Sequence, residues 1–248
     1  MLRSFLIYLS KARWARRVVT RWQIAWRVAS RFVAGETQAD AIRVIRELNA
    51  RGIHATLDHL GEHVTSEAEA NRAADEVIAM LDLIEAEGVR SGISIKLSQM
   101  GLLLGEEICE ANLRRILEHA RRKGNFIRID MEESALTDAT LRLFHKMLDE
   151  GFGRHVGVVI QAYLYRSQDD LAEIVRRGGF VRLCKGAYKE PPEIAYPKKA
   201  DVDASYDRLA QVLLDGALDA GAPLASEDGH FPPIPAIASH DEARIAFA

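Results

Sequence analysis

The chain has 248 residues, of which 48% are hydrophobic and 28% are charged, as is ordinary for a soluble globular protein. This length suffices for one large α/β domain or for two small ones. The formal net charge of −3 gives no reason to expect nucleic acid as a partner. No apolar run reaches the ~18 residues that cross a bilayer, so we expect no membrane-spanning segment.

The charge is unevenly distributed, and residues 1–35 form a basic arm. They contain eight Lys and Arg residues and no acidic residue, which leaves −11 for the rest of the chain. Large apolar residues, among them Trp14, Trp22 and Trp26, lie between these cations, so the pattern predicts a basic amphipathic helix or pair of helices. The arm either packs on the protein with a solvated basic face or makes a peripheral contact with anionic lipid. Its composition is also compatible with a transit peptide.

Cysteine usage bears on the compartment. Cys109 and Cys184 are the only cysteines, and they form no CxxC motif. This usage fits a reducing cytosol and does not fit a structural zinc site. We therefore expect a cytoplasmic protein without a bound metal. Residues 1–35 are the segment that would make a peripheral contact with the inner face of the membrane.

From residue 36 onward, predicted strands alternate with predicted amphipathic helices. Thr37 and Asp40 have the spacing of a helix N-cap, and Ser66 caps the next helix. We expect irregular loops at 188–202 and 221–235, and we place the second on the face of the sheet opposite the functional groups. The expected strands are 53–57, 93–97, 126–129, 156–160, 180–183 and 236–238, and the expected helices are 37–50, 66–87, 109–122, 137–150, 168–177 and 203–220.

This alternation predicts parallel βαβ units. A doubly wound open sheet is one solution, but no GxGxxG motif or P-loop follows the first strand. Every predicted strand instead ends in polar residues, which is typical of the catalytic face of a (β/α)8 barrel. We therefore predict an α/β fold of the TIM-barrel type, with about six of the eight βα units present in residues 36–248.

The most informative stretch is FVRLCKGAY, at 180–188. Its apolar start predicts a buried strand, yet Arg182 and Lys185 stand near the strand's end, and Gly186 permits close approach of another group to the backbone. Because uncompensated charge is costly in a buried strand, we expect an anion opposite at least one of the two cations. Other strands also end in polar groups, and the full set is Asp58, Lys96, Asp130, Gln161, Arg182, Lys185 and His240.

These groups are compatible with more than one chemistry. Lys96 and Asp130 end neighbouring strands and should form an ion pair, which matches a zwitterionic ligand. The donors around Arg182 suit an oxidoreductase that binds a flavin or a phosphate-bearing cofactor. A Schiff-base lyase or aldolase would instead use Lys96 or Lys185.

Two further interpretations carry less weight. A metal hydrolase would use Asp58, His59, His63 and His240, but this sequence lacks the HxH spacing typical of the first strand in such barrels. A barrel scaffold without catalytic activity is the remaining interpretation, and the run of polar groups on successive strand ends argues against it.

Several motifs resemble the proline dehydrogenase family of the monofunctional bacterial type. They occur in the family's order and cover roughly residues 32–248. The most specific are the strand-end motifs KLS, DME, IQAY, RLxKGAY and ASHD. In this chain they stand within FVAGET, GIHATLDHLGEHV, ISIKLSQMG, IRIDMEES, VVIQAYLYR, VRLCKGAYKEP and AIASHD.

The resemblance implies a distorted barrel that binds FAD, oxidises L-proline to Δ1-pyrroline-5-carboxylate and passes the electrons to a quinone in the membrane. It implies that Lys96 meets the substrate carboxylate, that Asp130 orders the active site, and that Arg182 lies near the flavin N5 atom. It also assigns residues that line the flavin, namely Met131, Gln161, Lys185, Gly186, Ala187, Ser239 and His240.

This sequence departs from the family in two places. Ser239 stands where the family more often has Thr, a change that keeps the hydroxyl. The family's barrel continues with two more strands and a last helix, whose Tyr and adjacent Arg pair grip the substrate carboxylate, whereas this chain ends at Ala248. We therefore expect a C-terminally truncated member of low stability, with little proline oxidation.

Overall fold

The computed structural model describes residues 33–35, 37–58, 61, 64–219, 221, 230 and 235–248. The predicted basic arm therefore lies outside the described residues, apart from its last three. The same holds for His59 and His63 of the metal hypothesis and for most of the expected loop 221–235.

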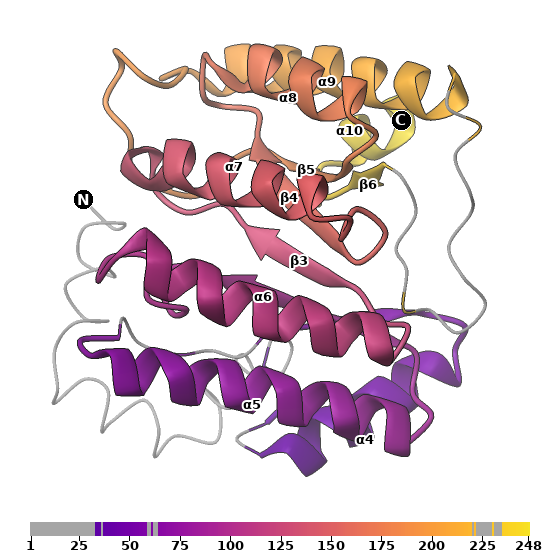
Figure 1. Cartoon of the computed structure of the whole chain (residues 1–248). Helices are drawn as coiled ribbons and strands as arrows, with labels where there is room; N and C mark the ends of the chain where they lie inside the picture. Colours follow the sequence, from indigo (N-terminus) through magenta and orange to yellow (C-terminus); the bar gives the residue numbers. More distant parts are fainter. Residues whose placement is uncertain are drawn as a thin grey trace, which may run out of the picture.

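Six parallel strands form one sheet in the order β1-β2-β3-β4-β5-β6, so each strand pairs with its neighbours in the chain (Figure 1). This confirms the predicted succession of βαβ units. Within the described part of the chain, β1 and β6 are the edges of the sheet. The strands are β1 (Ala55–Asp58), β2 (Ser91–Lys96), β3 (Ile127–Asp130), β4 (Val156–Gln161), β5 (Phe180–Cys184) and β6 (Ala236–Ile237).

The helices that connect the strands lie on the outer side of the sheet (Figure 1). The predicted capping box at the first of them is present, because Thr37 and Asp40 each accept a hydrogen bond from the other's backbone. Ser66 caps α5 as predicted. The helices are α4 (Gln38–Asn49), α5 (Glu67–Ala86), α6 (Glu106–Arg122), α7 (Ser134–Asp149), α8 (Ser167–Arg176), α9 (Lys199–Asp219) and α10 (Glu242–Phe247).

Three helices begin three or more residues earlier than the sequence predicts. α6 and α7 each start three residues before the expected residue, and the first turn of α6 holds Glu106 and Glu107, whose charges favour a helix N-terminus. α9 starts at Lys199, so the expected loop 188–202 is partly helical. An ion pair between Lys199 and Asp203, one turn apart, stabilises this start.

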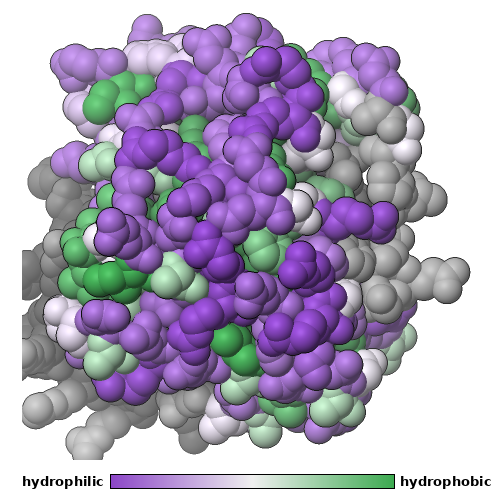
Figure 2. All heavy atoms as spheres, in the orientation of Figure 1, coloured by the Kyte–Doolittle hydropathy of each residue, from purple (hydrophilic) through white to green (hydrophobic). Residues whose placement is uncertain are grey.

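The hydrophobic core lies between the sheet and its helices. Residues of alternate positions on the strands, such as Ile95, Ile129 and Val158, are buried together with Leu117 of α6 and Phe144 of α7. Each such side chain contributes roughly 1.5–3 kcal/mol by leaving water. Figure 2 shows that the helical face turned toward the viewer is mostly hydrophilic, with apolar residues in small patches.

The inner face of the sheet carries the polar residues, and contacts across it show that the sheet is strongly curved. Arg182 of β5 lies 3.4 Å from Ser94 of β2, measured from Nη1 to Oγ, although three strand spacings of ~4.8 Å separate those strands along the sheet. The curvature brings the carboxyl ends of the strands around one mouth, as the barrel prediction requires.

The opposite, amino-terminal face of the sheet holds the described part of the loop before β6. His230 lies there, with its Nε2 atom 3.4 Å from the carbonyl oxygen of Val89, just before β2. This placement agrees with the face predicted for the loop. In the part of the chain that the structure describes, no helix has both the length and the hydropathy to cross a bilayer.

Candidate active site

A cavity of about 620 Å3 opens at the carboxyl ends of β2 to β6. All ten residues to which the sequence assigned catalytic, substrate-binding or cofactor-binding roles line it. They are Lys96, Asp130, Met131, Gln161, Arg182, Lys185, Gly186, Ala187, Ser239 and His240. Six more lining residues were not among the predicted site residues, namely Val159, Cys184, Tyr188, Lys199, Ala238 and Asp241.

Four charged residues, which we call the Asp130 cluster, meet on one side of this cavity. They are Asp58, Lys96, Asp130 and Arg182. The parallel register places Lys96 beside Asp130, and the two form the predicted ion pair with 3.2 Å between Nζ and Oδ2. Lys96 also lies 2.7 Å from Asp58, and Arg182 donates to the other carboxylate oxygen of Asp130. Asp130 therefore bridges two cations.

The pKa of Lys96 shows how this cluster is balanced. Burial acts to lower that pKa, but the hydrogen bond to Asp58 and the charge of Asp130 outweigh it, so the pKa lies above its usual value. Lys96 is therefore a permanent cation at neutral pH. Such a group can bind a carboxylate, but it is a poor amine nucleophile.

Buried polar contacts hold the strand ends that frame the cavity. Glu132, which follows β3, accepts hydrogen bonds from the backbone N–H and the hydroxyl of Ser98, at 3.0 and 2.5 Å. Gln161 at the end of β4 donates to the backbone carbonyl of Glu132 at 2.9 Å. These contacts join the ends of three neighbouring strands and hold the Gln161 side chain from the β3 side.

Gly186 is required where it stands. Its φ of +117° is one that L side chains rarely adopt, and a Cβ atom there would lie 2.3 Å from the ring of Tyr163. The backbone N–H of Tyr163 donates to the carbonyl of Lys185 at 2.9 Å. The turn that presents Gly186 and Ala187 to the cavity is therefore packed directly on the end of β4.

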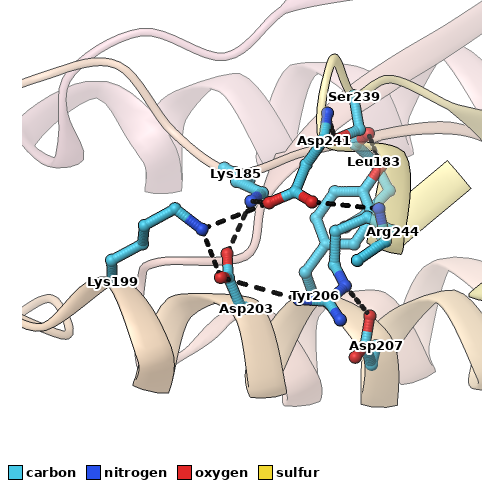
Figure 3. Close-up of polar contacts among 10 residues, drawn as sticks. Leu183, Lys185, Lys199, Asp203, Tyr206, Asp207, Ser239, Asp241 and Arg244 are labelled. Carbon is cyan, nitrogen blue, oxygen red and sulfur yellow. Dashed lines mark hydrogen bonds and ion pairs between the residues drawn. The ribbon is translucent and has the colours of Figure 1, made fainter.

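A second group of charges, which we call the Lys185 network, borders the other side of the cavity (Figure 3). The ammonium of Lys185 donates to Asp203 at 2.5 Å and to Asp241 at 2.6 Å. Hydrogen bonds from Lys185 and Lys199 hold the pKa values of both carboxylates below their usual range. The network comprises Lys185, Lys199, Asp203, Asp207, Asp241 and Arg244, and so balances three cations with three carboxylates.

These contacts answer the question of which anions face the two cations of FVRLCKGAY. Within the described residues, Arg182 faces Asp130, and Lys185 faces Asp203 and Asp241. The sequence reasoning did not foresee the partners of Lys185. The only signal was the spacing of Lys199 and Asp203, one helical turn apart, in a stretch that was expected to be a loop.

The donor set of the cavity fits a flavin. Arg182 offers a guanidinium, and Ser239 and His240 add a hydroxyl and an imidazole on the β6 side. Electron-rich heteroatoms of an isoalloxazine ring or phosphate oxygens are suitable acceptors for such groups. Among the described residues, no group of three or more His, Cys, Asp and Glu side chains could hold a metal ion.

Comparisons with solved structures agree with the fold. The sheet resembles that of proline utilization A from Bdellovibrio bacteriovorus, inactivated by N-propargylglycine, with a TM-score of 0.76 and 24% identity over 90% of this chain and 26% of that one. For a Bradyrhizobium japonicum proline utilization A variant the TM-score is 0.72, with 21% identity over 94% of this chain and 26% of the other. The fold is thus a distorted TIM-barrel-like α/β fold, with its candidate site at the carboxyl ends of the strands.

Sequence comparisons define the family. The family profile described as Proline dehydrogenase matches residues 41–248. Proline dehydrogenase of Deinococcus radiodurans is 43% identical over 190 residues, which cover 75% of this chain and 61% of that protein. Proline dehydrogenase 1 of Bacillus subtilis strain 168 is 34% identical over 251 residues, which cover 100% of this chain and 76% of that protein. The chain belongs to the proline dehydrogenase family.

Proposed function

We propose that this protein oxidises L-proline to Δ1-pyrroline-5-carboxylate with FAD as its cofactor. The observation that supports this most strongly is the Asp130 cluster, which places a carboxylate between two cations in a cavity of a proline dehydrogenase family member. A zwitterionic amino acid carries both charges that such a cluster can bind.

Each residue of the cluster has a role that follows from its charge. Lys96 and Arg182 attract the substrate carboxylate, and Asp130 keeps both cations in place while offering an acceptor to the substrate amine. When bound, the flavin supplies the oxidant that accepts hydride from the substrate ring. Arg182 lies where its positive charge favours an electron-rich ring, and Gly186 and Ala187 provide a backbone wall without bulky side chains.

The test is an assay of the purified protein with L-proline and a dye as electron acceptor. We expect slow proline-dependent dye reduction that requires FAD and that falls further in Lys96→Met. Asp138→Asn is a matched control, because Asp138 is an exposed carboxylate that pairs with Arg166 away from the cavity. Equal activity in Lys96→Met and in the wild type would contradict the proposed role of Lys96.

A Schiff-base lyase is disfavoured by the same geometry. The raised pKa of Lys96 keeps its amine protonated, and Lys185 donates to two carboxylates. Borohydride reduction in the presence of a keto acid should therefore leave both lysines unmodified. A covalent adduct on either lysine, detected by mass spectrometry, would support the lyase instead.

We further propose that a membrane quinone accepts the electrons and that the basic arm, residues 1–35, brings the enzyme to an anionic membrane surface from the cytoplasm. The eight cations and the tryptophans of the arm support this. The protein should sediment with vesicles that contain anionic lipid and not with neutral ones. Removal of residues 1–32 should abolish this binding, and sedimentation unchanged by the deletion would contradict it.

A further inference from the structure

Arg128 of β3 lies beneath the candidate site, inside the curved sheet. It stands two residues before Asp130 on the same strand, so both side chains point to the inner face. Its guanidinium carbon lies 4.8 Å from the centre of the Phe126 ring. A Cβ atom on Gly157 of β4 would lie 2.5 Å from Arg128 Nη1, so the absence of a side chain at Gly157 makes room for the guanidinium.

This arginine is buried, and no described carboxylate forms an ion pair with it. Its exposed fraction is 3%, and among the described residues its Nη1 atom has no hydrogen-bond partner and its guanidinium forms no ion pair. Burial, followed by the repulsion of Arg182, lowers its pKa to about 9, which still leaves it charged at neutral pH. An uncompensated buried cation destabilises a fold, and such costs are typical of functional sites.

Arg128 has two charged neighbours that belong to the site above it. Arg182 repels it and Asp130 attracts it, and both of these residues line the cavity whereas Arg128 does not. We propose that Arg128 is a positioning residue, whose buried charge holds Arg182 up against Asp130 and raises the positive potential of the cavity floor. Its influence on the ligand is therefore exerted through two residues that face the cavity.

The charge explains why the strand carries Arg at this position. An apolar residue of similar length would also pack on Phe126; it would lose the attraction between the cation and the ring but would avoid the burial of a charge. The stability lost by burying this charge is consistent with a benefit in the site. A bound flavin becomes more electron-rich on reduction, and a positive charge nearby stabilises that form. This part of the inference depends on the proposed function, whereas the coupling of Arg128 to Asp130 does not.

The first experiment needs no cofactor and compares melting temperatures of the purified protein. Arg128→Met should raise the melting temperature by roughly 3–6 °C, because it removes a buried unpaired charge. The gain should be larger in an Asp130→Asn background, where the cations of the site lose their shared anion. Arg121→Met is the matched control, since Arg121 is exposed and stacks on Phe152 at the same 4.8 Å, and it should not raise the melting temperature.

The second experiment measures the flavin potential and the kinetics of the site. In the FAD-loaded protein, Arg128→Met should lower the midpoint potential of the flavin and reduce kcat/KM for proline roughly tenfold, while Arg128→Lys, which keeps the charge, should restore most of both. Any one of three results would show that Arg128 serves packing alone. Arg128→Met could melt below the wild type, it could fail to fold, or it could leave both the flavin potential and the kinetics unchanged. Failure of the wild type to bind FAD would overturn the proposed function, and the melting experiments would then decide the role of Arg128 alone.

Discussion

The two charged groups beside the cavity are similar in composition and different in construction. The Asp130 cluster draws three members from strand ends and Arg182 from the middle of β5, and the shared anion, Asp130, has only 17% of its side chain exposed. The Lys185 network joins one strand end to α9 and α10, and Lys199 at its rim is 73% exposed. Both are electrically balanced.

The difference shows that a cation at a strand end does not by itself indicate a ligand site. The Asp130 cluster is held by sheet register, because the pairing of β2 with β3 places Lys96 beside Asp130. The Lys185 network has a structural task as well, beside the cofactor-binding role predicted for Lys185. β6 is two residues long, and the carboxylate of Asp241 ties the segment after it to Lys185 and Lys199. The network therefore keeps Ser239 and His240 at the cavity wall.

The largest expected effect comes from removing the anion of the Asp130 cluster. Asp130→Asn leaves Lys96 and Arg182 without their shared partner, so we expect kcat/KM for proline to fall about 100- to 1000-fold. Steady-state kinetics with a dye acceptor measure this. Asp138→Asn is the control, and a loss of less than tenfold in Asp130→Asn would remove Asp130 from the mechanism.

The next largest effect is the loss of stability when a side chain is added at Gly186, a change that alters packing and leaves the charges in place. Gly186→Ala should lower the free energy of unfolding by about 2–4 kcal/mol, because it forces an unfavourable φ and a clash with Tyr163. Gly88→Ala is the matched control: Gly88 has a φ of +59° but nothing within 4 Å, so about 1–2 kcal/mol is expected. Denaturant titrations measure both, and equal losses would show that Tyr163 does not restrict the site.

A third prediction compares the two lysines. Lys185→Met should lower stability by about 1 kcal/mol, an effect that shrinks in high salt because the network is partly exposed. Lys96→Met should raise the KM for proline and change stability less. Thermal melts at low and high salt, paired with kinetics, distinguish the two. The same outcome for both variants would remove the distinction between the cluster and the network.

The smallest expected effect is on the melting temperature at acidic pH. Asp203 and Asp241 have pKa values below the unfolded value of 3.8, so their stabilisation is present above about pH 4 and is lost as the pH falls through their folded pKa values. Asp241→Asn should therefore flatten the decline of the melting temperature between about pH 5 and pH 2. If the melting temperature of Asp241→Asn declines in acid as steeply as that of the wild type, Asp241 forms no stabilising ion pair with Lys185 or Lys199 in the folded state.

The residues whose positions follow from strand register were predictable from the sequence. Lys96 and Asp130 end short apolar runs and Arg182 lies within one, and parallel strands place such residues around one mouth. The start of α9 and the partners of Lys185 were not predictable, because a Pro-bearing, charged stretch has no periodicity that identifies the facing residues. Arg128 gave a signal only as a charge inside an apolar strand, and only the three-dimensional structure shows that its Nη1 atom has no hydrogen-bond partner among the described residues.

The most direct test of the proposed function is the visible spectrum of the purified protein, loaded with FAD and kept free of oxygen, before and after addition of L-proline. We predict a flavin spectrum that proline bleaches in the wild type and that stays unbleached in Asp130→Asn under the same conditions. A protein that binds no flavin, or whose bound flavin is indifferent to proline, would contradict the assignment of this cavity to proline oxidation.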